Sequence, residues 1–375
     1  MITNSWVMLG IFFGCAALAV ALGTKTKIGS AIGGPIIALV LGMILVNCNI
    51  MPGWADVHSV IFSYLINIAV PLLLFKVNLK NLSKLGGKIL IAFLLGTIGT
   101  MIGAIVAGLT CGVGAETWKA YGMFAATYIG GSVNLASVGN GLGVDGSIWT
   151  AVSAADAIIF VVYMIFLMSF ANWKFTKKHY KLSTELGYKI QLNEEKVAKK
   201  EESHFGIAIT IGAAVAIAAV GEWIGGLLNV PGILFSTAIA LVVAGTTKIG
   251  EVSDASEHIG TFLIDVYFVA LGCTAVIKDV IAAGPILFIG AAIVIGIHCL
   301  FLFGVGGAMK LPVDYLIMSS VANIGGPSLG PSVSQGYGWK HMTAPGIVLG
   351  LLGYAVGTYL GFAVAYLLKS MLLGA

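Results

Sequence analysis

Ten continuous apolar runs constrain this chain more than any other feature, because each is about as long as a membrane is thick. A helix needs ~20 apolar residues to span ~30 Å of hydrocarbon. The overall content of 58% hydrophobic and 10% charged residues is outside the range of soluble domains. Continuous runs also argue against an outer-membrane barrel, whose strands alternate. We predict an all-α polytopic membrane protein whose spans lie at 5–22, 28–46, 57–75, 88–110, 147–171, 205–224, 229–247, 258–277, 282–309 and 344–368.

A glycine-broken stretch occurs twice. Tyr128-Ile-Gly-Gly-Ser-Val-Asn134 has a counterpart 195 residues later, Asn323-Ile-Gly-Gly-Pro-Ser328. Glycine, serine, asparagine and proline weaken a membrane helix or leave backbone polar groups without partners. Two such interruptions at corresponding places in two halves of a chain point to a transporter's substrate and ion site.

The lysines indicate the topology, since all 20 basic residues are lysine and there is no arginine. If each glycine motif is a re-entrant hairpin, the chain crosses the membrane ten times and 17 lysines share one side. Only Lys119, Lys278 and Lys369 lie on the other. The positive-inside rule then assigns the 17 to the cytoplasm and both termini to the outside. Two full crossings by the motifs would divide the lysines 8 to 12 and put the lysine-rich central loop outside.

Five crossings per half make the halves inverted repeats. A second similarity, between Ile61–Asn67 and Ile259–Asp265, supports the duplication. We predict a first repeat at 1–171 with its hairpin at 118–143, and a second at 205–375 with its hairpin at 313–338. The first hairpin enters from outside and the second from the cytoplasm. The intervening segment 172–204 carries eight lysines and five glutamates, and we expect it to be a solvated cytoplasmic linker.

The two glycine tips are expected to meet inside the protein, because unpaired backbone in hydrocarbon costs several kcal/mol per group. The N–H groups that follow each tip carry positive partial charge and suit an anionic ligand. Without arginine, recognition depends on backbone dipoles, serine and asparagine. The alternative is that these are small residues for close helix packing. The predicted substrate-binding residues are Gly130, Gly131, Ser132, Asn134, Asn323, Gly325, Gly326 and Ser328.

Acidic residues within apolar runs are the candidates for ion coupling. Asp156 and Asp265 are predicted to act with Asn134 and Ser137, and Na⁺ would bind at Asp156 and Asn134. For Asp265, the alternative is a satisfied polar pair between helices. His298 also lies in an apolar run, and we interpret it as a hydrogen-bonded core histidine, with a proton relay as the alternative.

Other chemistry is disfavoured by context. Gly326-Pro-Ser-Leu-Gly330 fits G-x-S-x-G, but a nucleophile elbow needs an α/β sheet. The five cysteines lack metal-ligand spacing and are expected to be free. We therefore expect no enzyme activity, no cofactor beyond Na⁺ or H⁺ as coupling ion, and no nucleic-acid binding.

The two Gly-Gly motifs and the full-length architecture resemble the YjcL-like family of uncharacterised bacterial membrane proteins. More distantly, they are similar to the hairpin tips of sodium:glutamate symporters and 2-hydroxycarboxylate transporters. That resemblance implies a scaffold domain that forms a homodimer and a transport domain that moves in an elevator-like way. Pro327 departs from the pattern, because it occupies a polar position of the second tip.

The combined prediction is an ion-coupled secondary transporter in the bacterial cytoplasmic (inner) membrane. Its substrate would be a small organic anion, an amino acid or a short peptide held between the two tips. Coupling to Na⁺ is preferred over H⁺. A channel and an intramembrane enzyme that uses the broken-helix site remain as alternatives, and so does a membrane sensor.

Overall fold

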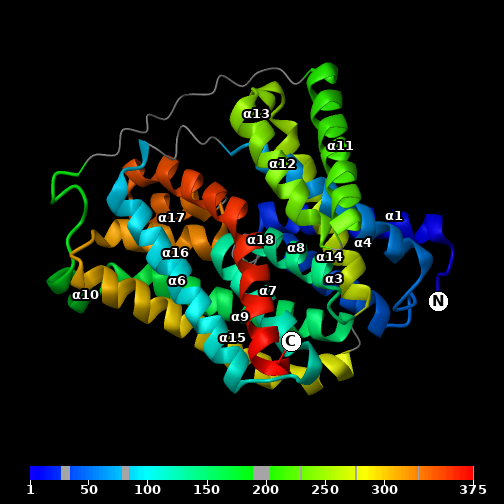
Figure 1. The fold of residues 1–375 in the computed structure, drawn as a ribbon, viewed down its shortest axis with the longest axis horizontal. Helices are drawn as coiled ribbons and strands as arrows, with labels where there is room; N and C mark the ends of the chain where they lie inside the picture. The colour runs from blue at the N-terminus through cyan, green and yellow to red at the C-terminus, as the bar shows by residue number, and fades with distance from the viewer. Residues whose placement is uncertain are drawn as a thin grey trace. The chain divides into compact units, whose positions relative to one another are not determined.

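Every element in the part of the chain that the structure describes is a helix (Figure 1). The computed structural model describes residues 1–26, 34–77, 84–188, 203–228, 230–274, 277–327 and 329–374. The ten apolar runs fall on ten of these helices, which confirms the predicted all-α class. They are α1 (Ser5–Lys25), α3 (Gly34–Asn47), α4 (Asp56–Leu74), α6 (Gly87–Thr110), α9 (Gly146–Phe170), α11 (His204–Leu228), α12 (Gly232–Thr246), α14 (Ala255–Cys273), α15 (Ile277–Ala308) and α18 (Thr343–Leu373).

Seven helices among the described residues are long and apolar enough to cross a membrane. The chain is therefore a multi-pass membrane protein. The three runs outside this set are α3 and α12, with 14 and 15 residues, and α14, with 19. At 1.5 Å per residue, the first two reach only ~21–23 Å along their axes. The start of the run 28–46 lies outside the described residues. Ten crossings and the sides of the termini stay predictions.

The helices form two compact units, and each unit combines segments from both halves of the sequence. Unit 1 contains Met1–Lys76, Gly139–Ile158 and Lys200–Phe288, and unit 2 contains Val77–Val138, Ile159–Lys199 and Ile289–Ala375. Spatial units and sequence repeats are different divisions of a chain, since a compact unit can contain segments from both halves. The predicted repeat boundaries therefore stay predictions.

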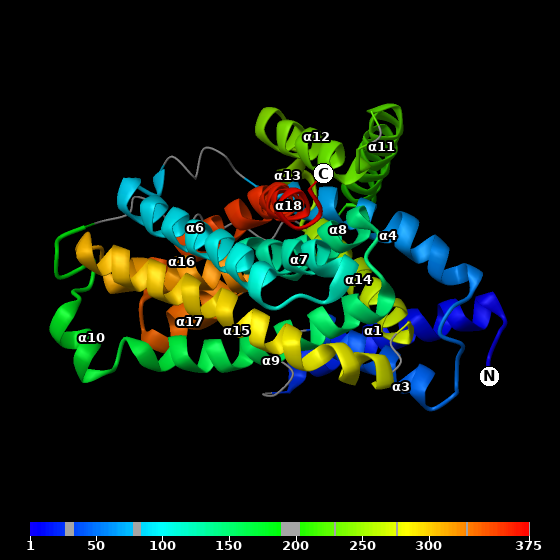
Figure 2. The ribbon, with the colours of Figure 1, turned by 60° about the horizontal axis from the view of Figure 1, so that its bottom comes forward.

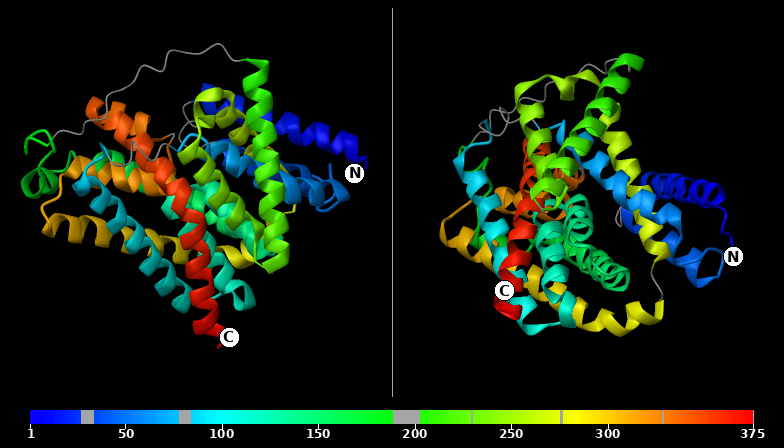
Figure 3. Two further views of the ribbon diagram at one scale, coloured as in Figure 1. Left: turned by 45° about the horizontal axis from the view of Figure 1, so that its top comes forward. Right: turned by 45° about the vertical axis from the view of Figure 1, so that its right-hand side comes forward.

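In unit 1, α14 is central and packs against α3 and α4. Its second half, from Ile264 to Cys273, is buried throughout. Glycines let α3 and α14 cross at backbone contact, since a Cβ on Gly42 would lie 2.1 Å from the carbonyl oxygen of Val269. A Cβ on Gly272 would lie 2.1 Å from the Leu39 oxygen. Figure 3 shows α11 and α12 of the same unit side by side in both views.

In unit 2, α18 packs against α6 and α7 (Thr117–Gly130). Figure 2 shows α18 almost end-on (red) beside α7. Four of its glycines face the glycine-broken segments at distances that no side chain could occupy. A Cβ would lie 2.3 Å from backbone at Gly350, 2.7 Å at Gly353, 2.7 Å from a side chain at Gly357 and 2.6 Å from one at Gly361. Small residues allow such close approach in a membrane, where apolar burial between helices gives little driving force.

Part of the predicted linker makes hydrogen bonds to unit 2. We call residues 180–188 the docked linker. The Ser183 N–H donates to Asp314 Oδ1 at 2.9 Å, and the Ser183 hydroxyl donates to Asp314 Oδ2. His341 Nε2 lies 3.0 Å from the same oxygen, and Tyr180 Oη donates to the Phe303 carbonyl at 2.9 Å. Because Asp314 is fully buried, its carboxylate needs donors, and Ser183 of the docked linker supplies two of them.

Candidate functional site

Both glycine motifs interrupt a helix in the same way. Helix α7 ends at Gly131, with φ 78° and ψ −177°, and α8 (Ser132–Leu142) begins one residue later. Helix α16 (Val313–Gly325) is followed by its cap residue Gly326, with φ 68° and ψ −168°, and α17 (Leu329–Tyr337) comes next. Positive φ with an extended ψ is essentially restricted to glycine. The second glycine of each Gly-Gly pair is therefore the residue that permits the break.

The two breaks lie against each other within unit 2. A Cβ built on Gly131 would be 3.6 Å from the nitrogen of Gly326 and 3.8 Å from the carbonyl carbon of Gly325. The ring of Tyr354, from α18, borders both, because its Cε1 would lie 3.7 Å from a Cβ on Gly131 and 2.9 Å from one on Gly326. The expectation that the tips meet is met in this unit. Tyr354 was not among the predicted site residues.

The two predicted asparagines hold the breaks in place. Asn134 donates from Nδ2 to the carbonyls of Gly130 (2.8 Å) and Gly353 (3.3 Å), and its Oδ1 accepts from the Thr358 hydroxyl at 2.6 Å. Asn323 donates from Nδ2 to the Phe93 carbonyl at 3.2 Å, and its Oδ1 accepts from Thr97 at 3.3 Å. Both amides are buried. Their side chains thus position the helix ends beside the breaks.

The serines differ in what they offer. Ser132, the first residue of α8, is half-buried, and helix geometry leaves its N–H and that of Val133 without an acceptor in their own helix. Ser137 is fully buried and donates to the Val133 carbonyl of its own helix at 2.8 Å. Ser328 lies outside the described residues. Ser132 and the N–H groups beside it are therefore the polar groups at the first break that their own helix leaves available.

The predicted coupling acids belong to the other unit. Asp156 lies in the part of α9 that is in unit 1, and 9% of its surface is exposed. Asp265, in α14, is 1% exposed, and its Oδ1 has no hydrogen-bond partner among the described residues. A Cβ on Gly34 would lie 3.0 Å from that oxygen, so the carboxylate lies close to the backbone of Gly34. The association of either acid with the breaks stays a prediction.

His298 belongs to a hydrogen-bonded chain in unit 2 that the sequence did not indicate. Its Nδ1 is 2.9 Å from Thr100 Oγ1, and Thr100 donates to the Tyr128 carbonyl at 3.1 Å. Its Nε2 is 2.9 Å from Ser320 Oγ, which is 2.9 Å from Tyr163 Oη. Nδ1 is also 2.9 Å from the Gly96 carbonyl, which can only accept, so Nδ1 carries the proton and shares it between Gly96 and Thr100, while Nε2 of a neutral ring accepts from Ser320. The chain is complete and ends three residues before the first break.

The two Gly-Gly motifs indicate where the helices break, but the residues that surround the breaks have weaker signals in the sequence. Tyr354 stands in a glycine-rich helix, Gly350-Leu-Leu-Gly-Tyr354, and a lone polar-tipped ring among small residues was the available signal. For Thr100 and Ser320 there was none, since hydroxyl residues usually bond to their own helix.

The comparisons with known proteins agree with this architecture. A family described as "Protein of unknown function (DUF819)" matches residues 10–371. The chain is 27% identical to the "Uncharacterized membrane protein YjcL" of Bacillus subtilis (strain 168), over 95% of each chain. The match spans all the apolar helices and both breaks, which confirms the resemblance seen in the motifs. The chain belongs to the DUF819 family of membrane proteins.

Proposed function

We propose that this protein is an ion-coupled secondary transporter that binds a small organic anion, an amino acid or a short peptide at the paired helix breaks. The observation that carries the proposal is the contact between two glycine breaks of matching backbone conformation, from segments 195 residues apart. In membrane proteins, irregular backbone is tolerated only where protein or a water-filled cavity surrounds it. Paired breaks of this kind form the substrate and ion sites of transporters.

The chemistry of the breaks favours an anionic group. The N–H groups at the start of α8 carry the positive end of a helix dipole. The Tyr354 ring adds an apolar wall with a hydroxyl at its tip. Since the sequence has no arginine, a carboxylate there would be held by backbone N–H groups, Ser132 and Tyr354.

The movement that we propose is a displacement of one unit relative to the other, as the resemblance to elevator-type transporters implies. Two compact units that each draw on both halves of the sequence support this proposal. One unit would be the scaffold of a homodimer in the bacterial cytoplasmic membrane. The breaks are in unit 2, so unit 2 would carry the substrate.

For the coupling ion we propose Na⁺, with Asp156, Asn134, Ser137 and Asp265 as the candidate coupling residues. The engagement of Asn134 with Thr358 leaves its Oδ1 one further lone pair for a cation. A specific observation favours H⁺ as the second candidate, namely the continuous chain through His298. Proteoliposomes with either a Na⁺ or a pH gradient distinguish the two, since only the coupled ion drives accumulation.

The test combines ligand discovery with a matched pair of variants. Purified protein is screened by thermal shift against organic acids, amino acids and dipeptides, with and without Na⁺, because a ligand that binds the native state raises its melting temperature. Uptake of the hit is then measured for Gly326→Ala and for Gly114→Ala. Both glycines have positive φ, but a Cβ on Gly114 meets nothing within 4 Å, whereas one on Gly326 meets Tyr354.

We expect Gly326→Ala to abolish concentrative uptake and Gly114→Ala to retain it. Tyr354→Phe should raise KM with little change in the maximal rate if the hydroxyl contacts the substrate. Flux that never saturates would indicate a channel. Wild-type uptake by Gly326→Ala would overturn the proposal.

A further inference from the structure

A pocket lies entirely within unit 1, and none of the residues at the two breaks lines it. Its volume is about 660 Å³, within the range of small-molecule sites. Three segments far apart in the sequence line it: the loop before α4 with the start of that helix, the stretch from α8 into α9, and the end of α14. The lining residues are Gly53, Trp54, Phe62, Gly139, Asn140, Gly143, Val144, Asp145, Gly146, Ser147, Trp149, Tyr267, Leu271 and Thr274.

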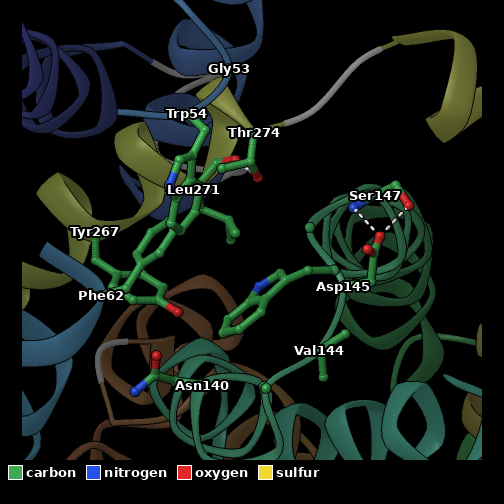
Figure 4. A pocket seen from close by; sticks show the side chains of 14 residues that line it. Gly53, Trp54, Phe62, Asn140, Val144, Asp145, Ser147, Tyr267, Leu271 and Thr274 are labelled. Carbon is green, nitrogen blue, oxygen red and sulfur yellow. Dashed lines mark hydrogen bonds between the residues drawn. The ribbon is translucent and has the colours of Figure 1, made fainter. Parts of the chain in front are cut away.

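Aromatic rings make up much of its wall. The rings of Trp54 and Phe62 are 5.7 Å apart, those of Phe62 and Tyr267 are 5.1 Å apart, and those of Tyr267 and Trp149 are 5.7 Å apart. Figure 4 shows Trp54, Phe62 and Tyr267 on one side of the pocket. A continuous series of four rings offers π faces that attract a cation or stack on a flat group.

The electrostatics select between these two uses. Asp145 is the one charged residue among the described residues of the lining, and in Figure 4 it lies across the pocket from Trp54, Phe62 and Tyr267. Its Oδ1 accepts from the Ser147 N–H at 2.9 Å and from the Ser147 hydroxyl, which fixes the carboxylate at the start of α9. Asn140, Ser147 and Thr274 add neutral polar groups. Because the described lining holds a carboxylate and no lysine, the pocket attracts cations and disfavours anions.

Trp149 is packed closely into the wall of the pocket. Its indole is 4% exposed, and a Cβ on Gly139 would lie 2.7 Å from the ring, so only glycine fits beside it. The indole Nε1 is buried without a hydrogen-bond partner among the described residues. A buried N–H without an acceptor costs ~1–3 kcal/mol, a cost more typical of binding sites than of plain packing.

The three segments that line the pocket are predicted to share one side of the membrane. The lysine count assigns the loop at 47–56, the turn at 143–146 and the end of the run 258–277 to the same side of the membrane, the outside. The structure brings these three segments together around one pocket. A ligand would thus reach it from the outer aqueous phase or from the outer lipid headgroups.

We propose that this pocket binds the ammonium head of an organic cation, held between the aromatic rings and Asp145. Na⁺ prefers hard oxygen ligands, whereas an alkylated ammonium gains from ring faces. The ligand could be a free amine or the headgroup of an ethanolamine or choline lipid, since both present the same chemistry. This site is independent of the proposed transport function.

The test uses tetramethylammonium and choline as probes of the full-length protein in nanodiscs made only of phosphatidylglycerol. Binding is followed by tryptophan fluorescence, because Trp54 and Trp149 line the pocket. The neutral control is 3,3-dimethyl-1-butanol, which matches choline in shape without its charge, and NaCl at equal ionic strength controls for inorganic cations. We expect saturable quenching by the two ammonium compounds and none by either control.

The variants are Trp54→Leu and Asp145→Asn, with Trp223→Leu as a matched control. Trp54 is 59% exposed and Trp223 is 67% exposed, so neither substitution opens the core, and Trp223 is outside the pocket. The amide that Asp145→Asn introduces keeps an oxygen acceptor for Ser147, which preserves the start of α9. We expect Trp54→Leu to weaken binding about five- to thirtyfold, the equivalent of ~1–2 kcal/mol for a cation–π contact, and Trp223→Leu to leave it unchanged.

Equal quenching by the neutral isostere or by NaCl would overturn the proposal, and so would unchanged affinity in both pocket variants. A further arm identifies the source of the ligand. If nanodiscs that contain phosphatidylethanolamine weaken choline binding, the lipid headgroup occupies the pocket, and equal affinity in both lipids assigns it to a free amine. The proposal also fails if neither the free compounds nor this lipid binds.

Discussion

Gly350 gives the sharpest test of the packing that holds the second break. A Cβ at this position of α18 would lie 2.3 Å from the nitrogen of Pro327, 2.4 Å from its Cα and 2.5 Å from the carbonyl carbon of Gly326. All three are backbone atoms, so no rotamer change relieves the clash. Ordinary contact begins at 3.4 Å, and Gly350→Ala must therefore separate α18 from the break by about 1.1 Å.

The magnitude follows from a comparison with Gly296→Ala in α15 of the same unit, where a Cβ meets nothing within 4 Å. Both substitutions gain the same helix propensity, ~1 kcal/mol, and this term cancels in the difference. What remains is the cost of overpacking, ~1–3 kcal/mol. For a unit of this size, ~2 kcal/mol corresponds to a melting temperature lower by roughly 4–8 °C.

The assay is thermal unfolding of the purified protein, followed by the loss of the monodisperse peak in size-exclusion chromatography. We expect Gly350→Ala to melt several degrees below Gly296→Ala, and its uptake of substrate to fall because the break is displaced. If the two variants melt at the same temperature, α18 does not pack against the second break as described, and the reasoning is refuted.

Three further predictions test the topology, the first break and the docked linker. Cys48 is exposed, and we expect a membrane-impermeant maleimide to label it on intact cells, while the buried Cys111 stays unlabelled; protection of Cys48 would contradict the assignment of its loop to the outside. Thr358→Val removes the 2.6 Å hydrogen bond to buried Asn134, and we expect it to cost ~1–3 kcal/mol in thermal unfolding; an unchanged melting temperature would show that the bond contributes little. Asp314→Asn places an NH₂ group among the donors to the carboxylate, so trypsin should cut the docked linker faster than in the wild type, and equal rates would argue against this anchor.

Much of the fold could be predicted because a membrane helix can be recognised from one continuous apolar run of the sequence. The apolar run 344–368 had to be helical, since in lipid each backbone group must bond within its own segment. The double Gly-Gly motif could likewise be recognised as two interruptions. Both breaks occur at the second glycine, Gly131 and Gly326, where the backbone adopts a conformation that other residues avoid.

The surroundings of the breaks could not be predicted, because they depend on helices remote in sequence. Asn134 is predicted to act at the substrate and ion sites, and the structure adds that its amide is bonded to Gly130, Gly353 and Thr358. The bonds to Gly353 and Thr358 depend on the position of α18, which the sequence around Asn134 does not indicate. The docked linker is a similar case. Its charge content predicts a solvated segment, and its hydrogen bonds to the buried carboxylate of Asp314 depend on a helix remote in sequence.

The all-helical membrane class, the two glycine breaks and the family follow from the amino-acid sequence alone. The first two are local properties, since the hydrophobicity of a run and a Gly-Gly pair act over a few residues. The contact of the breaks beside Tyr354, and the pocket that residues from 53 to 274 form in unit 1, depend on tertiary packing. Such contacts join residues up to about two hundred positions apart, and they depend on which helix faces approach closely enough for glycine alone to fit.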